Sequence, residues 1–236
     1  MTRPGQGGTV EQASEARRAR LTTPRAAAVA GILFSVLLIA SMLLVRIAVP
    51  EDSSEPAGWI GDSGQAFALA LNLVPFAGIA FLWFIGVVRD RLGEHEDRFF
   101  ATVFLGSGLL FLATLFMAVA VASSAVGSSG SGIGGELDSS TYLFGRRLAY
   151  ETMNVYAMKM AGVFMISTCT MSLRTGIFPR WMAFLGIGLA LFLLVSIGFF
   201  LWAQLIFPLW VLLISVHILL ANLGKSNDED RAPADE

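Results

Sequence analysis

Lys159 is the residue with the clearest capacity for chemistry, because it is an ionisable side chain inside a long apolar run, 153–173. A charge within a membrane span is costly and is by default a candidate for function. Tyr156 and Thr170 share its helical face at 100° per residue, and Asn72 is a polar residue of another apolar run. Lys159, Tyr156, Thr170 and Asn72 are therefore the candidate ligand-binding residues.

Lys159 also has a structural interpretation. If the helix begins near residue 153, Lys159 lies only about 9 Å inside it, and its aliphatic stem can carry the ammonium group to the membrane interface. Its own helix offers no carboxylate three or four residues away. A polar partner would have to be Asn72, Gln204, a backbone carbonyl freed at Pro75, or an acid of a connecting loop. Structural pairing at the interface and an anion or substrate site both stay open.

Three further patterns resemble catalytic or metal sites but lack the context that such sites need. Gly127 to Gly130 fits the serine motif of rhomboid intramembrane proteases, yet His217 would lie about 20 Å away across the membrane, beyond hydrogen-bond reach. The glycine spacing at 130–135 fits a dinucleotide fingerprint, but no strand precedes it. His95 stands beside acids without a second histidine or cysteine. We predict no catalytic residue, no metal and no cofactor, and we expect a protein that is not an enzyme.

The composition indicates a membrane protein. Of the 236 residues, 55% are hydrophobic and only 14% are charged, against about 25% charged in a typical soluble domain. The charges are absent from several apolar runs that are long enough to cross a bilayer. A soluble domain would need five or six helices that are apolar on every face. The net charge of −2 and the lack of a basic stripe argue against nucleic acid as a partner.

We therefore predict an all-α bundle of six transmembrane helices between two disordered cytoplasmic tails. No charged residue occurs from Trp181 to Leu223, which is about twice the length that one span needs, so this stretch must fold back. The alternative is five spans with a re-entrant segment. The predicted segments are a basic tail at 1–25, a membrane domain at 26–223 with spans at 26–49, 66–88, 99–122, 153–173, 181–200 and 205–223, and an acidic tail at 224–236.

Local signals add detail to this arrangement. Gly31 and Ser35 form a small-xxx-small spacing, which lets another helix approach closely. Pro75 interrupts the second span, and an ordinary proline kink is the simplest interpretation. The mixed segment 141–152 predicts either an interfacial helix or a long outward extension of the fourth span. Gly176 suits the end of that span.

The basic residues predict the orientation. With the amino terminus inside, the cytoplasmic segments would hold 12 of the 16 lysines and arginines. Cytoplasmic loops of membrane proteins carry such an excess, so both termini are expected in the cytoplasm.

The run LRTGIFPRW at 173–181, with YAMKMAGVFMIS before it at 156–167, is similar to a segment of uncharacterised multi-pass membrane proteins of actinobacteria. The resemblance implies a multi-pass protein of the bacterial plasma membrane and no particular activity. We expect a structural or interaction protein that binds membrane lipid, partner helices or further copies of itself. The alternative is a small transporter or ligand-binding membrane protein with an outward-facing pocket around Lys159.

Overall fold

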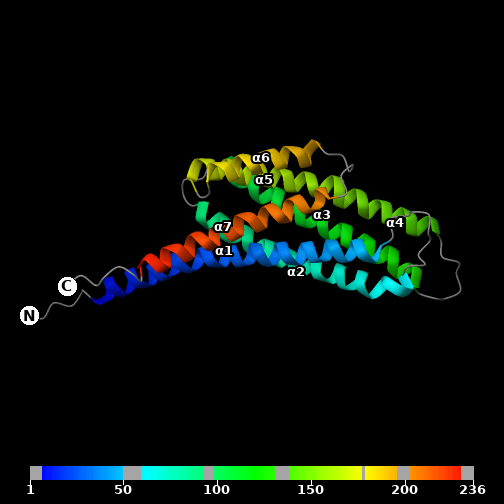
Figure 1. Ribbon diagram of the computed structural model, residues 1–236, viewed down its shortest axis with the longest axis horizontal. Helices are drawn as coiled ribbons and strands as arrows, with labels where there is room; N and C mark the ends of the chain where they lie inside the picture. Colours follow the sequence, from blue (N-terminus) through cyan, green and yellow to red (C-terminus); the bar gives the residue numbers. More distant parts are fainter. Residues whose placement is uncertain are drawn as a thin grey trace, which may run out of the picture.

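The computed structural model describes residues 7–49, 60–92, 98–130, 139–176, 179–195 and 202–229, and these ranges are helical apart from short connecting turns (Figure 1). The prediction of an all-helical chain is confirmed for this part of the protein. The elements are α1 (Gly7–Ala48), α2 (Ile60–Leu92), α3 (Arg98–Gly130), α4 (Ser139–Glu151), the π-helix η2 (Thr152–Ala157), α5 (Met158–Thr175), α6 (Arg180–Val195), the 3-10 turn η3 (Ala203–Leu205) and α7 (Ile206–Glu229).

Four segments of the described chain are long and apolar enough to cross a membrane. They correspond to predicted spans at 26–49, 66–88, 99–122 and 205–223. The structure gives them as Ala26–Ala48, Ser63–Arg89, Ala101–Val126 and Ala203–Ala221. Both α1 and α7 also extend into the predicted tails, since hydropathy reports where the apolar layer ends and not where backbone hydrogen bonding ends.

The other two predicted spans correspond to α5 and α6. α5 is less apolar because Lys159, Arg174 and several hydroxyl groups lie within it. Some of these hydroxyls donate to a carbonyl one turn earlier, as Thr168 Oγ1 does to Phe164 O at 2.7 Å. α6 is a shorter apolar helix of 16 residues, and the rest of the predicted span at 181–200 lies outside the described residues. Six spans therefore stay a prediction.

The segment from Ser139 to Thr175 forms one continuous helical rod, in which η2 joins α4 to α5 (Figure 1). Of the two predictions for the mixed segment 141–152, the structure shows the long extension of the following helix. The rod ends where the sequence predicts. Gly176 adopts a left-handed φ of 70° and its backbone N–H donates to Ser172 O at 2.8 Å.

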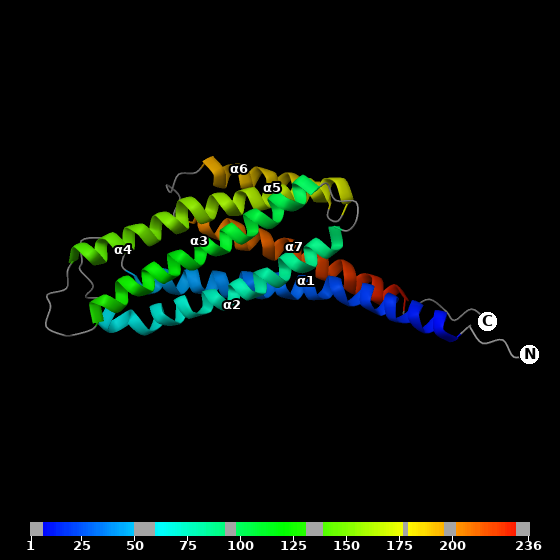
Figure 2. The ribbon, with the colours of Figure 1, turned by 180° about the vertical axis from the view of Figure 1, so that it is seen from behind.

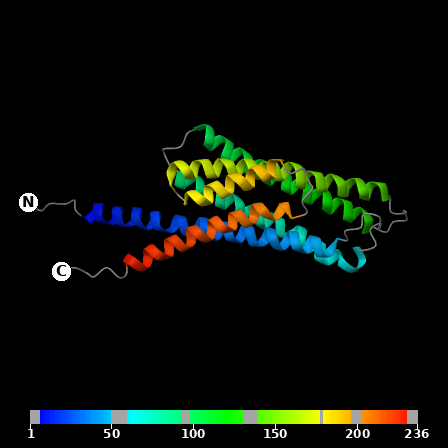
Figure 3. The same cartoon turned by 45° about the horizontal axis from the view of Figure 1, so that its top comes forward.

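The helices pack in two groups, which α3 connects together with contacts of α7 to α5 and α6. α1 lies against α2 and α7, and Figure 3 shows α7 crossing α1. On the other side, α5 lies against α6, and α3 contacts α2, α4, η2 and α5 (Figure 2). The start of α1 and the end of α7 lie at the same end of the bundle (Figure 1). The opposite end, formed by α4, the end of α3 and the start of α2, is called the α4 end below.

A cluster of buried phenylalanines fills the middle of the bundle. Phe81 is its centre, with ring centroids 4.6 Å from Phe34 and 5.2 Å from Phe164. Phe111 and Phe207 join it at 4.7 Å from each other. The phenylalanine cluster consists of Phe34, Phe81, Phe84, Phe104, Phe111, Phe164 and Phe207, all fully buried and contributed by α1, α2, α3, α5 and α7.

The close helix approach predicted at Gly31 is found. A Cβ atom at Gly31 would clash with Ser215 Oγ of α7 and would lie 2.9 Å from the ring of Phe84 of α2. Ser35 is fully buried and donates to Gly31 O at 2.8 Å, so its hydroxyl is satisfied within α1. The small residues thus let α7 and α2 pack directly on the α1 backbone.

Candidate ligand-binding cavity

A cavity of about 280 Å³ lies between α1, α2, α3 and the α4–η2 part of the rod. Its wall is mostly apolar. Ala118, Ala122 and Leu115 line it from α3, and Leu38 and Met42 line it from α1. The volume is close to the lower end of the range for small-molecule pockets, about 300 Å³, and it fits a segment of a hydrocarbon chain.

The phenylalanine cluster lies one helical turn beyond the inner end of this cavity. Leu38 follows Phe34 by one turn of α1, and Leu115 follows Phe111 by one turn of α3. On α1, α2 and α3, every residue that lines the cavity lies on the α4 side of the cluster. The cavity therefore does not extend into the cluster at the middle of the bundle.

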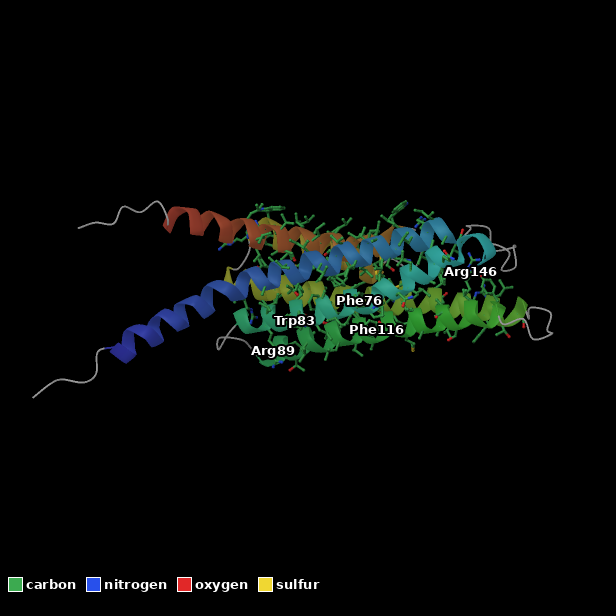
Figure 4. The ribbon with its side chains drawn as sticks, turned by 90° about the horizontal axis from the view of Figure 1, so that it is seen from below. Phe76, Trp83, Arg89, Phe116 and Arg146 are labelled. Carbon is green, nitrogen blue, oxygen red and sulfur yellow. The ribbon has the colours of Figure 1, made fainter. Side chains whose placement is uncertain are left out.

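One side of the cavity is polar along its length. This polar rim consists of Tyr142, Arg146 and Tyr150 of α4, Asn154 of η2 and Gln204 of η3. Gln204 Nε2 donates to Asn154 Oδ1, and Asn154 Nδ2 donates to Tyr150 O at 2.9 Å. Among the described residues that line the cavity, Arg146 is the only charged one. Figure 4 shows Arg146 at the α4 end of the bundle.

The π-helix η2 forms the part of the rod that faces Gln204. A π turn accommodates an extra residue in an α-helix and occurs frequently at functional sites. Here it contributes Met153 and Asn154 to the cavity wall. The hydroxyl of Thr152 is buried and donates to Leu148 O, one turn earlier in the same rod, at 2.8 Å. The amide of Asn154 instead accepts a hydrogen bond from another element, η3.

A cation–π contact holds the neighbouring element in place. The guanidinium carbon of Arg46, near the end of α1, lies 4.4 Å from the ring centroid of Trp202. Trp202 immediately precedes η3, and its carbonyl accepts a hydrogen bond from Leu205 N at 3.1 Å. The end of α1 thus fixes the turn that carries Gln204.

The four residues predicted from the sequence do not line this cavity. Asn72 is exposed on α2, where its side chain donates to Ala68 O at 2.8 Å within the same helix. Tyr156 is 61% exposed, and Thr170 donates to Ile166 O at 2.8 Å. Their role as ligand-binding residues stays a prediction.

Lys159 is half-buried on the side of α5 that faces α6. Gly162, one turn further along, packs so closely on α6 that a Cβ atom there would lie 3.1 Å from Ala190 O. Lys159 therefore lies near the level of the last described turn of α6, and residues 196–200, which follow that turn, lie outside the described residues. In the part of the chain that the structure describes, Lys159 makes no hydrogen bond or ion pair. Gln204, suggested above as a partner, bonds to Asn154 instead.

The other sequence patterns gain no partners in the described ranges. His217 is half-buried in α7, and no group of three or more histidines, cysteines or acids lies close enough there to hold a metal. Gly127 to Gly130 form the last turn of α3. His95 and most of the glycine-rich segment that follows α3 lie outside the described residues.

A second hollow lies on the outside of the bundle, between α1 and α2. Its volume is about 630 Å³, and its wall consists of apolar and aromatic side chains, including Phe76, Ile79 and Trp83. Figure 4 shows Phe76 and Trp83 on the same side of the bundle as Phe116. All three are exposed, which is typical of a surface that faces lipid chains. The described residues that line this hollow offer no charged group to orient a ligand.

Sequence reasoning did not identify Arg146, Asn154 and Gln204 as members of one site. One signal was available, since Tyr142, Arg146, Tyr150 and Asn154 recur every fourth residue and so lie on one face of a helix. Using that signal requires knowing that the helix continues from 139 into the apolar run. Comparisons of the chain with protein-family models, with curated proteins and with solved structures give no match.

Proposed function

We propose that this chain is a multi-pass membrane protein that binds a lipid, inserting a hydrocarbon chain into the cavity at the α4 end. The observation that carries the proposal is the division of the cavity wall into a large apolar part and a polar rim along the rod and η3. An amphipathic molecule has the same division. Small-molecule sites likewise combine mostly apolar walls with a few polar groups that orient the ligand.

The helix surfaces support a membrane location for this site. Four segments can span a bilayer, and large apolar side chains are exposed along them, including Trp83 at 67% and Phe76 at 62%. We infer six spans with both termini in the cytoplasm of a bacterium, because that threading puts 12 of the 16 basic residues inside. The α4 end would then face outward, so lipid would enter from the outer leaflet.

Binding is favoured over transport by the phenylalanine cluster. A transported molecule would have to pass from the cavity toward the opposite end of the bundle, where Phe34, Phe81 and Phe111 occupy the centre without exposed surface. The geometry thus supports a protein that holds a lipid at one end of the bundle. Such binding agrees with a structural or interaction role in the membrane.

Filling the cavity tests the proposal. Ala122→Trp places a large side chain into the cavity, whereas Ser123→Trp, one residue along, adds the same side chain on an exposed face of α3. Purified protein is mixed with phosphatidylglycerol in detergent, and bound lipid is counted by native mass spectrometry. We expect Ala122→Trp to lose bound lipid several-fold and Ser123→Trp to keep it. Equal retention by both variants, or no bound lipid in the unmodified protein, would contradict the proposal.

A further inference from the structure

We propose that the turn at 202–205, called the strap below, sets the rate at which lipid enters and leaves the cavity. This inference rests on the proposed lipid-binding function and adds a route and a gating element. It begins from the helices that surround the cavity. Among the described elements, α1 packs on α2, α2 on α3, and α3 on the rod, whereas no comparable packing joins α1 to α4 or η2. The route into the cavity lies along this seam between α1 and the rod.

The strap crosses the seam with one side-chain contact on each side. On the α1 side, the guanidinium carbon of Arg46 lies 4.4 Å from the ring centroid of Trp202. On the rod side, Gln204 Nε2 donates a hydrogen bond to Asn154 Oδ1 of η2. The start of α7, which follows the strap directly, lies between α1 and the rod (Figure 1, Figure 3). The strap thus ties together the two walls of the seam.

Both contacts are weak enough to break and form again. Trp202 is 57% exposed, and a cation–π contact at an exposed site favours the closed arrangement by about two- to five-fold in an equilibrium constant. A hydrogen bond between two neutral amides adds a comparable factor, because other polar groups can replace it. Gln204 lines the cavity, whereas Trp202 and Arg46 do not. The strap can therefore be loosened at Trp202 without a change to the cavity wall.

A gate has a kinetic signature that a binding contact does not have. Loosening the strap raises the population of the open form equally in the empty and the loaded protein. Entry and exit then become faster by the same factor, and the affinity for lipid does not change. Loss of a contact to the lipid would instead lower the affinity.

A lipid-exchange measurement tests the inference. The purified full-length protein with bound phosphatidylglycerol is mixed in detergent with excess deuterated phosphatidylglycerol, and native mass spectrometry follows the replacement over time. We expect Trp202→Leu to exchange lipid about two- to five-fold faster than the unmodified protein, with the same bound fraction at equilibrium. Trp181→Leu is the matched control, since Trp181 is similarly exposed, at 59%, on α6, and it should leave the exchange rate unchanged.

Two further variants examine each side of the strap. Trp202→Phe keeps an aromatic face for Arg46 and should exchange lipid at nearly the unmodified rate. Gln204→Leu releases the rod side and should accelerate exchange. Gln65→Leu, the same substitution at an exposed position of α2, should not. If Trp202→Leu does not fold, the comparison of Gln204→Leu with Gln65→Leu decides in its place.

Other results overturn a stated part of the account. An unchanged exchange rate in Trp202→Leu, or an equal acceleration in Trp181→Leu, would reject the strap as a gate and leave lipid binding intact. A lower bound fraction in Trp202→Leu would also reject the gate, because it would show a change of affinity. Absence of bound lipid in the unmodified protein would reject lipid binding itself.

Discussion

At the scale of single residues, the charged residue that stands out most in the sequence is not the charged residue that lines the cavity. Lys159 stands out because apolar residues surround it in the chain, whereas Arg146 stands among polar neighbours. In the fold, Arg146 lines a cavity and Lys159 lies near the last described turn of α6. The residue that differs most from its neighbours in the sequence is therefore not the residue that lines the cavity.

The structural interpretation predicts that Lys159 extends to the membrane interface, although the helical rod that carries it begins 20 residues earlier, at Ser139. In a Cys169→Ser background, single cysteines replace Tyr156, Lys159, Ile166 and Thr170. A membrane-impermeant maleimide added to intact cells should label the first two and not the last two. Labelling that reaches Thr170 would instead reveal a water-filled path along α5 and would restore the alternative of a transporter with a pocket around Lys159.

At the scale of elements, the phenylalanine cluster joins five helices through side chains that touch no solvent or lipid. Phe81→Ala should lower the free energy of unfolding in detergent by about 3 kcal/mol, since it leaves a cavity among Phe34, Phe111, Phe164 and Phe207.

Phe76→Ala is the matched control for this substitution. Phe76 lies on the same helix and is 62% exposed, so its removal should change stability by less than about 0.5 kcal/mol. Thermal unfolding followed by circular dichroism measures both variants. A similar loss for Phe76→Ala and Phe81→Ala would mean that the cluster does not hold the helices together.

The elements themselves were largely predictable, and the reason is physical. Apolar runs of membrane length can satisfy their backbone only as helices, so the spans at 26–49, 66–88, 99–122 and 205–223 agree with the structure within a few residues. Gly176 ends the rod as expected, because glycine readily adopts the left-handed conformation found there.

The π turn and the cavity were not predictable in the same way. Hydrophobic periodicity distinguishes a helix from a strand but does not reveal the extra residue that η2 accommodates. The cavity depends on how α1, α2, α3 and the rod pack together, and Gln204 joins its rim from a turn far along the chain. Such a site arises from tertiary packing, which a single sequence does not express as a local pattern.

At the scale of the whole molecule, the bundle has two unlike ends. The start of α1 and the end of α7 lie together at one end (Figure 1). The cavity with its polar rim lies toward the other end. The phenylalanine cluster separates them. With the termini in the cytoplasm, this asymmetry would present the rim to the outer leaflet, from which a lipid could insert its chain without crossing the membrane.

The location of a bound lipid tests the central claim most directly. The unmodified protein is reconstituted into vesicles that contain phosphatidylglycerol with a photoactivatable diazirine in its acyl chain, and the cross-linked residues are identified by mass spectrometry. We expect strong cross-links at cavity residues such as Met42 and Met153, above the background at the outer surface. Cross-links confined to outer-surface residues such as Phe76 and Trp83 would contradict the account, because the lipid would then only surround the bundle.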